Sequence, residues 1–337
     1  MHNLHRYYSL LIIFFIFLCY RSQAQSRNDI LYYFREVVKQ EKIIVGQHCR
    51  DGERIVDGGY DDLVLKLRDK TGKLVSLIGA DLGWQADVDM MRIARKLNDH
   101  WKLGGLVTVN WHALNPWAGG VRDMEIGGTN GDELKELLTP GHPAYMYWRK
   151  ELDKVASALQ YLRDNEVIVL WRPLHEMNGD WFWWCGRDKD EYIALWRDMY
   201  NYFTNTKGLD NLIWIYSPNA VLPDSKLKNV MYYYPGDNYV DIVGEDIYND
   251  EPVTSGYEQY MKEAPGKIYV VGEFGANDQR GTLENTIVID AFKGKAAYYL
   301  QWHGWRGNRV AIIENPGTRE LMNHKDIITL DELRIKR

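Results

Sequence analysis

The chain has 337 residues, of which 45% are hydrophobic and 26% are charged, a composition typical of a globular protein. Its formal net charge is −6 at pH 7, and no run of Lys or Arg offsets it. We therefore expect neither nucleic acid nor an anionic membrane surface as a partner. The unusual feature is the aromatic content, with 13 Trp and 23 Tyr. Such rings suit the apolar faces of sugars, although a large core could hold them equally well.

The N-terminal 25 residues have the features of a signal peptide. A basic start in residues 1–6 precedes an apolar run in residues 10–18, and small or polar residues follow at 22–24. The apolar run is shorter than the roughly 20 residues of a membrane-spanning helix, and the bulky residue before Cys19 makes a poor lipid-attachment signal. We predict a signal peptide over residues 1–25 and an exported product, periplasmic or extracellular and free of the membrane.

Two cysteines, Cys49 and Cys185, remain in the predicted mature chain. Two cysteines do not make a disulfide framework, and a domain of this size does not need one. Whether they pair depends on their distance, which the sequence leaves open.

Residues 26–337 contain no repeat, low-complexity tract or linker and predict a single domain. Short apolar runs alternate with longer amphipathic segments, and consecutive apolar positions are typical of parallel strands buried on both faces. The candidate strands are residues 42–47, 74–80, 106–111, 167–172, 212–216, 240–245, 267–273 and 297–302. The candidate helices are residues 90–100, 144–165, 191–206 and 257–264.

Eight strands alternating with helices predict an α/β fold, a (β/α)8 TIM barrel that forms one catalytic domain over residues 26–337. The competing fold is an open doubly wound sheet, but residues 46–53 read GQHCRDGE and lack its Gly-rich phosphate loop. Polar and aromatic residues just past the strand ends also favour the barrel, whose active sites form on that face. They are His48, Asp81, Trp84, His112, His175, Glu176, Asp246, Tyr248, Glu273, Trp302 and His303.

Glu176 follows a predicted buried strand and precedes the aromatic block of residues 181–184. A carboxyl group beside aromatic rings is poorly solvated when charged, so its pKa should rise. A general acid working near neutral pH needs that rise. The alternative is that Glu176 only forms an ion pair with Arg172.

Glu273 ends another apolar strand, between Gly272 and Gly275, and glycines at a strand end permit close approach of a ligand. The alternative is a glycine turn with an incidental acid. At the ends of the fourth and seventh strands, Glu176 and Glu273 would lie across the barrel mouth. Glycosidases use such a pair, about 5–5.5 Å apart when retaining and roughly 6.5–9.5 Å apart when inverting. The sequence does not measure that gap.

The run RPLHEMNGDWFWW at residues 172–184 resembles glycoside hydrolase family 26, whose best-known members are β-mannanases. Further runs are similar to motifs of the same family, so the resemblance spans most of the mature chain. These runs are VNWHALNP at 109–116, GEDIY at 244–248, VVGEFG at 270–275 and DIITLDEL at 326–333.

The resemblance implies a retaining barrel glycosidase with Glu176 as acid/base and Glu273 as nucleophile. It places His175 where most of the wider clan has Asn, and Arg172 where a cation would keep Glu273 ionised. It also implies that Tyr248 hydrogen-bonds Glu273 or the sugar. The other implied substrate-binding residues are His112 and Trp181 near the cleaved bond, Trp302 in the floor, and Trp117 and Asp246.

The implied reaction is endo-hydrolysis of β-1,4 bonds in mannan, glucomannan or galactomannan through a covalent glycosyl-enzyme. Separately, we expect a monomer and no cofactor. The family's lichenase-like and xylanase-like members make mixed-linkage β-glucan and xylan alternative substrates. A non-catalytic mannan-binding protein is an alternative of another class. A metal-dependent barrel hydrolase is a third, but the four strand-end histidines form no HxH or HExxH pair, so no metal is expected.

Overall fold

The computed structural model of the protein describes residues 26–84, 87–118, 133–277, 280–304 and 307–335. The predicted signal peptide, residues 1–25, lies outside the described residues. Among the helices of the described residues, none combines the length and the apolar character needed to span a bilayer.

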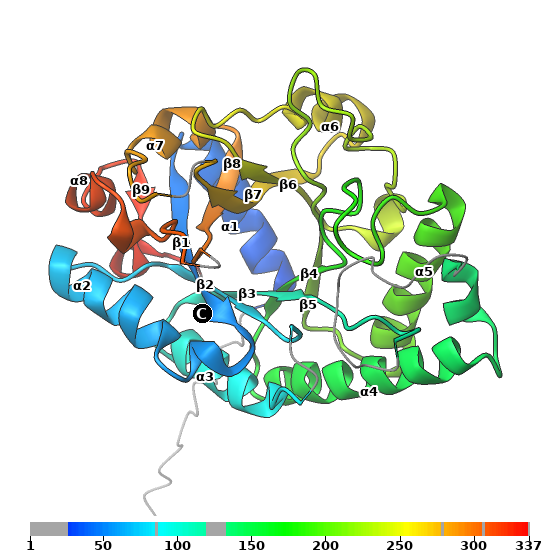
Figure 1. The fold of residues 1–337 in the computed structure, drawn as a ribbon. Helices are drawn as coiled ribbons and strands as arrows, with labels where there is room; N and C mark the ends of the chain where they lie inside the picture. The colour runs from blue at the N-terminus through cyan, green and yellow to red at the C-terminus, as the bar shows by residue number, and fades with distance from the viewer. Residues whose placement is uncertain (1–25, 85–86, 119–132, 278–279, 305–306, 336–337) are drawn as a thin grey trace, which may run out of the picture.

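Eight parallel strands form a closed barrel, because β1 pairs with both β2 and β8. The strands follow one another round the barrel in chain order, and most helices lie outside them, whereas α1 lies across one end (Figure 1). The TIM barrel predicted from the sequence is confirmed, and the alternative prediction of an open doubly wound sheet is wrong. The strands are β1 (Ile43–Asp51), β2 (Leu77–Asp81), β3 (Leu106–Trp111), β4 (Val169–Pro173), β5 (Leu212–Tyr216), β6 (Ile242–Tyr248), β7 (Ile268–Gly275), β8 (Ala296–Gln301) and the short β9 (Ile327–Ile328), which pairs with the start of β1.

All eight predicted strands correspond to observed ones, and the predictions for β3 and β5 match at both ends. The largest difference is at β1, which continues to Asp51, four residues beyond its predicted end at Gln47. This extension follows an irregularity between His48 and Asp51, after which Asp51 pairs with Asp81 of β2. The irregularity carries the end of β1 toward the carboxyl-terminal mouth of the barrel.

The four predicted helices are present, although α5 ends at Asn201 and the chain continues as a π-helical turn over residues 202–206. Asp89 and Asp188 cap α3 and α5 by accepting hydrogen bonds from backbone amides of the first turn. Four further helices were not predicted: α1, α2, α7 and α8. The helices are α1 (Arg27–Lys39), α2 (Lys66–Thr71), α3 (Met90–Lys102), α4 (Pro143–Asp164), α5 (Lys189–Asn201), α6 (Tyr257–Glu263), α7 (Ile287–Phe292) and α8 (Thr318–Met322).

Alternate residues of each strand face two different apolar layers, as the pleat of a strand requires. In β5, Ile213 and Ile215 belong to a cluster with residues of all eight barrel strands and of α1, which is the barrel interior. Leu212 and Trp214 of the same strand pack in the larger cluster that includes the surrounding helices. This two-sided burial explains the unbroken apolar runs in the sequence.

Helix α1 closes the amino-terminal end of the barrel. Phe34 contacts Tyr298 of the barrel interior edge to face, with ring centroids 5.8 Å apart. Arg27 forms an ion pair of 2.6 Å with Asp241, immediately before β6. The amino ends of the strands are thus covered by an apolar plug.

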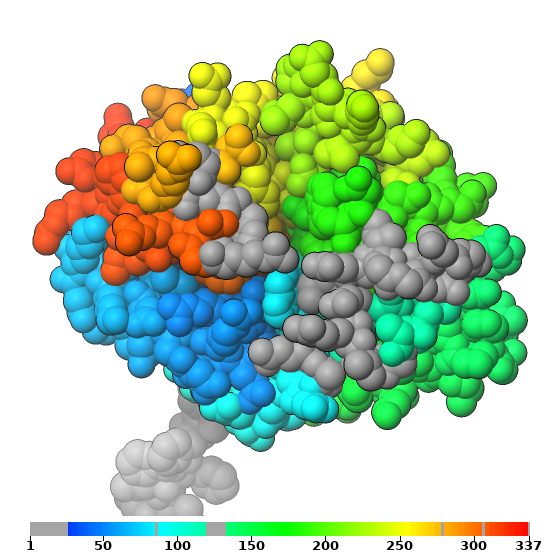
Figure 2. All heavy atoms as spheres, in the orientation of Figure 1, coloured from blue at the N-terminus to red at the C-terminus, as the bar shows by residue number. Residues whose placement is uncertain are grey.

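The barrel interior changes from apolar to polar toward the carboxyl ends of the strands. On the inward face of β1, the apolar Ile44 lies nearer the amino end and His48 lies nearer the carboxyl end. In β3, Leu106 and Asn110 are arranged in the same way. His48 and Asn110 meet inside the barrel through a hydrogen bond of 3.0 Å. Consecutive βα units lie side by side round the molecule, as the colours of Figure 2 show. Because all the barrel strands are parallel, their last residues lie at one shared face.

Candidate active site

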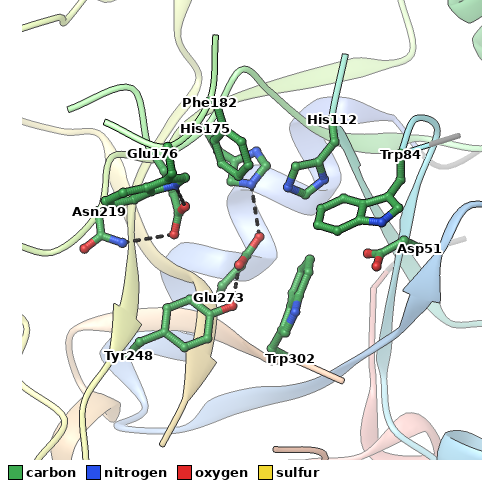
Figure 3. Close-up of a pocket in the computed structure, with 11 residues that line it drawn as sticks. Asp51, Trp84, His112, His175, Glu176, Phe182, Asn219, Tyr248, Glu273 and Trp302 are labelled. Atoms are coloured by element: carbon green, nitrogen blue, oxygen red, sulfur yellow. Dashed lines mark hydrogen bonds and ion pairs between the residues drawn. The ribbon is translucent and has the colours of Figure 1, made fainter. Parts of the chain in front are cut away.

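A cavity of about 370 Å³ lies at the carboxyl-terminal end of the barrel, in the size range of small-ligand sites. Glu176 and Glu273, predicted from strands far apart in the sequence, both line it (Figure 3). The lining residues in the described part of the chain are Asp51, Trp84, His112, His175, Glu176, Trp181, Phe182, Asn219, Tyr248, Glu273 and Trp302.

Glu273 is held by donors on both carboxylate oxygens. The guanidinium of Arg172 donates to Oε1 of Glu273 and also to Oδ2 of Asp246, the latter at 2.7 Å. Tyr248 donates its hydroxyl hydrogen to Oε2 at 2.6 Å. Burial opposes the charge of Arg172, but the carboxylates of Asp246 and Glu273 outweigh it and raise the pKa of Arg172. The positive charge of Arg172 is therefore shared by the two buried acids, and burial still raises the pKa of Asp246.

Gly272 allows this cluster to form directly beside the strand that carries Glu273. A Cβ at Gly272 would lie 2.5 Å from both Oδ1 of Asp246 and Oγ of Ser217. Those two atoms are joined by a hydrogen bond of 2.7 Å from Ser217 to Asp246. A side chain at position 272 would push these partners apart, so the glycine before Glu273 is required by close packing.

Glu176 has a different environment, with two neutral donors and, among the residues that the structure describes, no cation hydrogen-bonded to it. The indole nitrogen of Trp181 donates to Oε2 at 2.6 Å, and Nδ2 of Asn219 donates to Oε1 at 3.0 Å. Burial, followed by the negative charge of Glu273, raises the pKa of Glu176 to about 7, while the two hydrogen bonds act in the opposite direction. The carboxyl group can therefore exchange a proton near neutral pH.

The backbone of Glu176 adopts a left-handed conformation with φ 56°, which is uncommon for a side chain of this size. Its amide donates to the carbonyl of Ser217 at 2.8 Å, and its carbonyl accepts from the amide of Gly179 at 2.9 Å and from the thiol of Cys185 at 3.1 Å. Surrounding contacts thus fix the strained conformation. Cys185 and Cys49 are both free, buried thiols, which answers the question of their pairing.

Two histidines line the cavity beside the acids. Nε2 of His175 lies 3.4 Å from Oε1 of Glu273. Burial and the charge of Arg172 lower the pKa of His175, which favours a neutral ring. His112 contacts Asp81 through Nδ1 at 2.5 Å. Burial opposes its charge, but Asp81 outweighs this and raises the pKa of His112.

Aromatic rings form the walls of the cavity. Trp302 stacks on His48 with centroids 4.0 Å apart, and Trp84 meets His112 edge to face at 4.6 Å. Phe182 contacts the opposite side of the same histidine, with centroids 5.0 Å apart. Such surfaces suit a ligand with apolar faces and polar edges.

The structure brings seven of the ten sequence-predicted site residues to the cavity surface, and Arg172 and Asp246 lie directly beneath Glu273. Trp117 does not line the cavity. Its indole nitrogen donates to Glu136 at 2.7 Å, and its ring packs against Trp183. The seven residues are His112, His175, Glu176, Trp181, Tyr248, Glu273 and Trp302.

Four lining residues were not among the ten predicted site residues. The sequence named Trp84 only as a strand-end residue and Phe182 only as part of the aromatic block, and it did not single out Asn219 or Asp51. Asn219 comes three residues after β5, so the strand-end rule applied to the fifth strand would have found it. Asp51 was missed because β1 continues beyond its predicted end.

Two groups of side chains in the described part of the chain have ligand atoms within 4.8 Å of one another, as a metal site would. In one group Arg172 already binds both carboxylates. In the other, the two histidines share a hydrogen bond of 3.0 Å. The groups are His175 with Asp246 and Glu273, and His48 with Asp51 and His303.

Residues 21–332 match the model of glycosyl hydrolase family 26. The chain is 33% identical over 321 residues to mannan endo-1,4-β-mannosidase A and B of Caldalkalibacillus mannanilyticus, covering 84% of this chain and 58% of that protein. It is 35% identical over 258 residues to mannan endo-1,4-β-mannosidase of Bacillus subtilis strain 168, covering 71% and 68%. The chain thus spans little more than half the length of the first relative.

Solved structures agree with the sequence matches. A mannanase of Bacillus subtilis superposes with a TM-score of 0.79 at 26% identity, covering 93% of this chain and 95% of that one. GH26A from a Muricauda species superposes with a TM-score of 0.77 at 28% identity, covering 93% and 99%. Because the family model spans nearly the whole chain and the fold agrees, the protein belongs to glycosyl hydrolase family 26.

Proposed function

We propose that the protein is a retaining endo-β-1,4-mannanase in which Glu273 is the nucleophile and Glu176 is the acid/base. The observation that carries this proposal is the contrast between two glutamates in one cavity. Glu273 is bound by a cation and a hydroxyl group, whereas burial raises the pKa of Glu176 to about 7. Such divergent environments are typical of acid and nucleophile pairs.

In the first step, Glu273 attacks the anomeric carbon of the bound sugar. The bond to the glycosidic oxygen breaks, and that oxygen takes the proton of Glu176. Arg172 and Tyr248 hold the attacking carboxylate in place, and Trp181 and Asn219 fix the rotation of the acid. The products are a glycosyl ester on Glu273, a shortened chain and an ionised Glu176.

In the second step, Glu176 takes a proton from water while that water attacks the same carbon and releases Glu273. Ester formation removes the negative charge of Glu273, which is the second cause of the raised pKa of Glu176. The pKa of Glu176 then falls in the intermediate, which suits its change from acid to base.

The names of the relatives support mannan as the substrate. The relatives from Caldalkalibacillus mannanilyticus and Bacillus subtilis are both named mannan endo-1,4-β-mannosidases. We assign sugar contacts to His112, Trp181 and Trp302, which line the cavity beside the two acids. Glucomannan and galactomannan fall in the same substrate class, because they share the β-1,4-linked mannose backbone.

We also propose that residues 1–25 direct export, to the periplasm or outside the cell, and that the mature protein is a monomer. The basic, apolar and small-residue order of that segment supports export. N-terminal sequencing of protein recovered outside the cytoplasm and size-exclusion chromatography test these two points.

The test of the main proposal compares wild type, Glu273→Ala and Glu258→Ala, a change at an exposed carboxylate of α6, on unbranched mannan, mixed-linkage β-glucan and xylan. We expect reducing ends from mannan with wild type and Glu258→Ala, and a loss of at least about 10⁴-fold with Glu273→Ala. Proton NMR should show the β-anomer as the first product. First appearance of the α-anomer, or binding of mannan without hydrolysis by wild type, would refute the proposal.

A further inference from the structure

Asp51 lines the active-site cavity and keeps one buried carboxylate oxygen unused as a hydrogen-bond acceptor among the described residues. Its side chain is only 2% exposed, and it lines the cavity. Oδ2 accepts from Nη2 of Arg54 at 2.9 Å and lies 3.3 Å from Nε2 of His303. Oδ1 is buried and has no hydrogen-bond partner among the described residues. Burial opposes the charge of Asp51, but His303 and neighbouring histidines outweigh it and lower its pKa.

An ionised carboxylate only accepts hydrogen bonds, so the natural partner of Oδ1 is a donor supplied by a ligand. A buried acceptor left without a donor is costly, and few exist in folded proteins. The carboxylate of Asp51 points inward toward the cavity, with the indole of Trp84 beside it (Figure 3). A sugar hydroxyl is a donor of the required kind and size.

The position of Asp51 indicates the side of the cleaved bond on which the sugar that supplies this hydroxyl would lie. Asp51 is the last residue of β1, whereas Glu176 follows β4. Between these two strands lie β2 and β3 in one direction round the barrel and β5, β6, β7 and β8 in the other. The two side chains therefore come from different walls of the barrel. Figure 3 places Glu273 between Asp51 and Glu176. Since the general acid stands on the side of the departing group, the end with Asp51 holds the part of the chain on the non-reducing side.

Aromatic side chains at this end complete the site. Trp84 is partly exposed and lines the cavity, and Trp302 lies between Glu273 and Trp84 in the view of Figure 3. Aromatic faces pack against the C–H faces of a sugar ring, while a carboxylate binds its hydroxyl edge. The two kinds of contact occur together beside Asp51.

We propose that Asp51 is a specificity-determining residue that binds the second sugar unit on the non-reducing side of the cleaved bond, through hydrogen bonds from ring hydroxyls to Oδ1. The proposal rests on the proposed role of Glu176 as the acid. It assigns this position to a neutral sugar, because the negative charge of Asp51 repels the carboxylate of a uronic acid.

The test uses mannotetraose labelled at its reducing end. Weaker binding of the second unit should move cleavage toward release of one mannose from the non-reducing end, which leaves the label on a trisaccharide instead of a disaccharide. We expect Asp51→Ala to raise the ratio of labelled trisaccharide to labelled disaccharide by roughly 10- to 100-fold, the value of a hydrogen bond to a charged group. Asp51→Asn, which keeps the shape of the side chain, should give a smaller rise.

Asp57→Ala is the matched control, because Asp57 lies in the same segment but pairs with Arg92 outside the cavity. It should leave the ratio unchanged, and melting temperatures should show that all variants fold. An unchanged ratio in folded Asp51→Ala would refute the proposal. Loss of wild-type activity on dialysis against a chelator would instead assign Asp51 and His303 to a cation. Neither result alters the test of Glu273 on mannan, so the two proposals fail separately.

Discussion

Tyr248 donates its phenolic hydrogen to Oε2 of Glu273, the oxygen opposite the one that Arg172 binds. One carboxylate is therefore held by a neutral hydroxyl on one side and a cation on the other. Two donors on different oxygens fix the rotation of the carboxylate, so the proposed nucleophile would be oriented before the substrate arrives.

Replacing Tyr248 by Phe should remove the donor to Oε2 and keep the ring. We expect kcat on mannan to fall by roughly 10- to 100-fold with little change in KM, because the lost contact orients the nucleophile. Steady-state kinetics on mannan measure both constants. Tyr234→Phe is the control, since its hydroxyl binds Asp237 at an exposed site. A large rise in KM alone would mean that Tyr248 binds the sugar.

The acid role of Glu176 predicts a dependence on the leaving group. Glu176→Ala should lower kcat/KM on mannan by about 10²–10⁴-fold, because the departing sugar oxygen needs a proton. An aryl mannobioside with an acidic phenol leaves without that help, so its kcat/KM should fall far less. Parallel assays on the two substrates make the comparison. Equal losses on both would contradict the assignment.

The pH profile should follow the protonation of Glu176. The acid is active when protonated, so kcat/KM should decline as the pH rises through about 7, the raised pKa of this group. Asn219 donates to the charged form and so lowers this pKa. In Asn219→Ala the pKa should increase, and the alkaline midpoint should move upward by roughly 0.5 pH. Asn205→Ala, at an exposed site, should leave the midpoint in place, and a downward move in Asn219→Ala would be contrary to the prediction.

His100 should make the fold sensitive to acid. Burial lowers its pKa from 6.5 to about 4, while its ring nitrogens contact the hydroxyl of Tyr60 and the carbonyl of Ser76. Above pH 6.5 the ring is neutral in both states. As the pH falls from 6.5 to about 4, the unfolded chain binds a proton that the folded protein does not, which costs about 3 kcal/mol of stability.

Melting temperatures of wild type and His100→Gln between pH 7 and pH 4 measure this contribution. The variant should be less stable at pH 7, because the bonds of the buried ring are lost, and its melting temperature should fall less steeply with acid. His324→Gln changes a partly exposed ring and should follow wild type. Parallel curves for wild type and His100→Gln would show that His100 is not the acid-sensitive group.

The barrel strands could be predicted because each is a short apolar run bounded by polar residues. The helices α2, α7 and α8, with six, six and five residues, are too short to show a helical repeat. Helix α1 is different, since Ile30, Phe34 and Val37 recur at helical spacing behind the capping residue Ser26. Its signal is present in the sequence and was overlooked.

The two glutamates could be predicted because each directly follows an apolar strand and a recognisable run of residues. Asp51 could not, because its place depends on an irregularity in the pairing of β1 with β2, and such irregularities arise from contacts between strands. The substrate-binding role of Trp117 stays a prediction, although Trp117 does not line this cavity. A Trp near a strand end can pack outward as well as inward, and here Glu136 and Trp183 hold it outside the cavity.

The barrel interior is apolar at the end covered by α1 and polar or charged at the mouth. The residues that stabilise the fold and those that bind the substrate are therefore at opposite ends. Substitutions near Phe34 and Tyr298 alter a dry, close-packed region and should change the unfolding temperature while leaving product patterns intact. Loops around the mouth can vary in length with little effect on that region. New chain-length or branching preferences can therefore be engineered at one end of this scaffold while its resistance to heat is improved at the other.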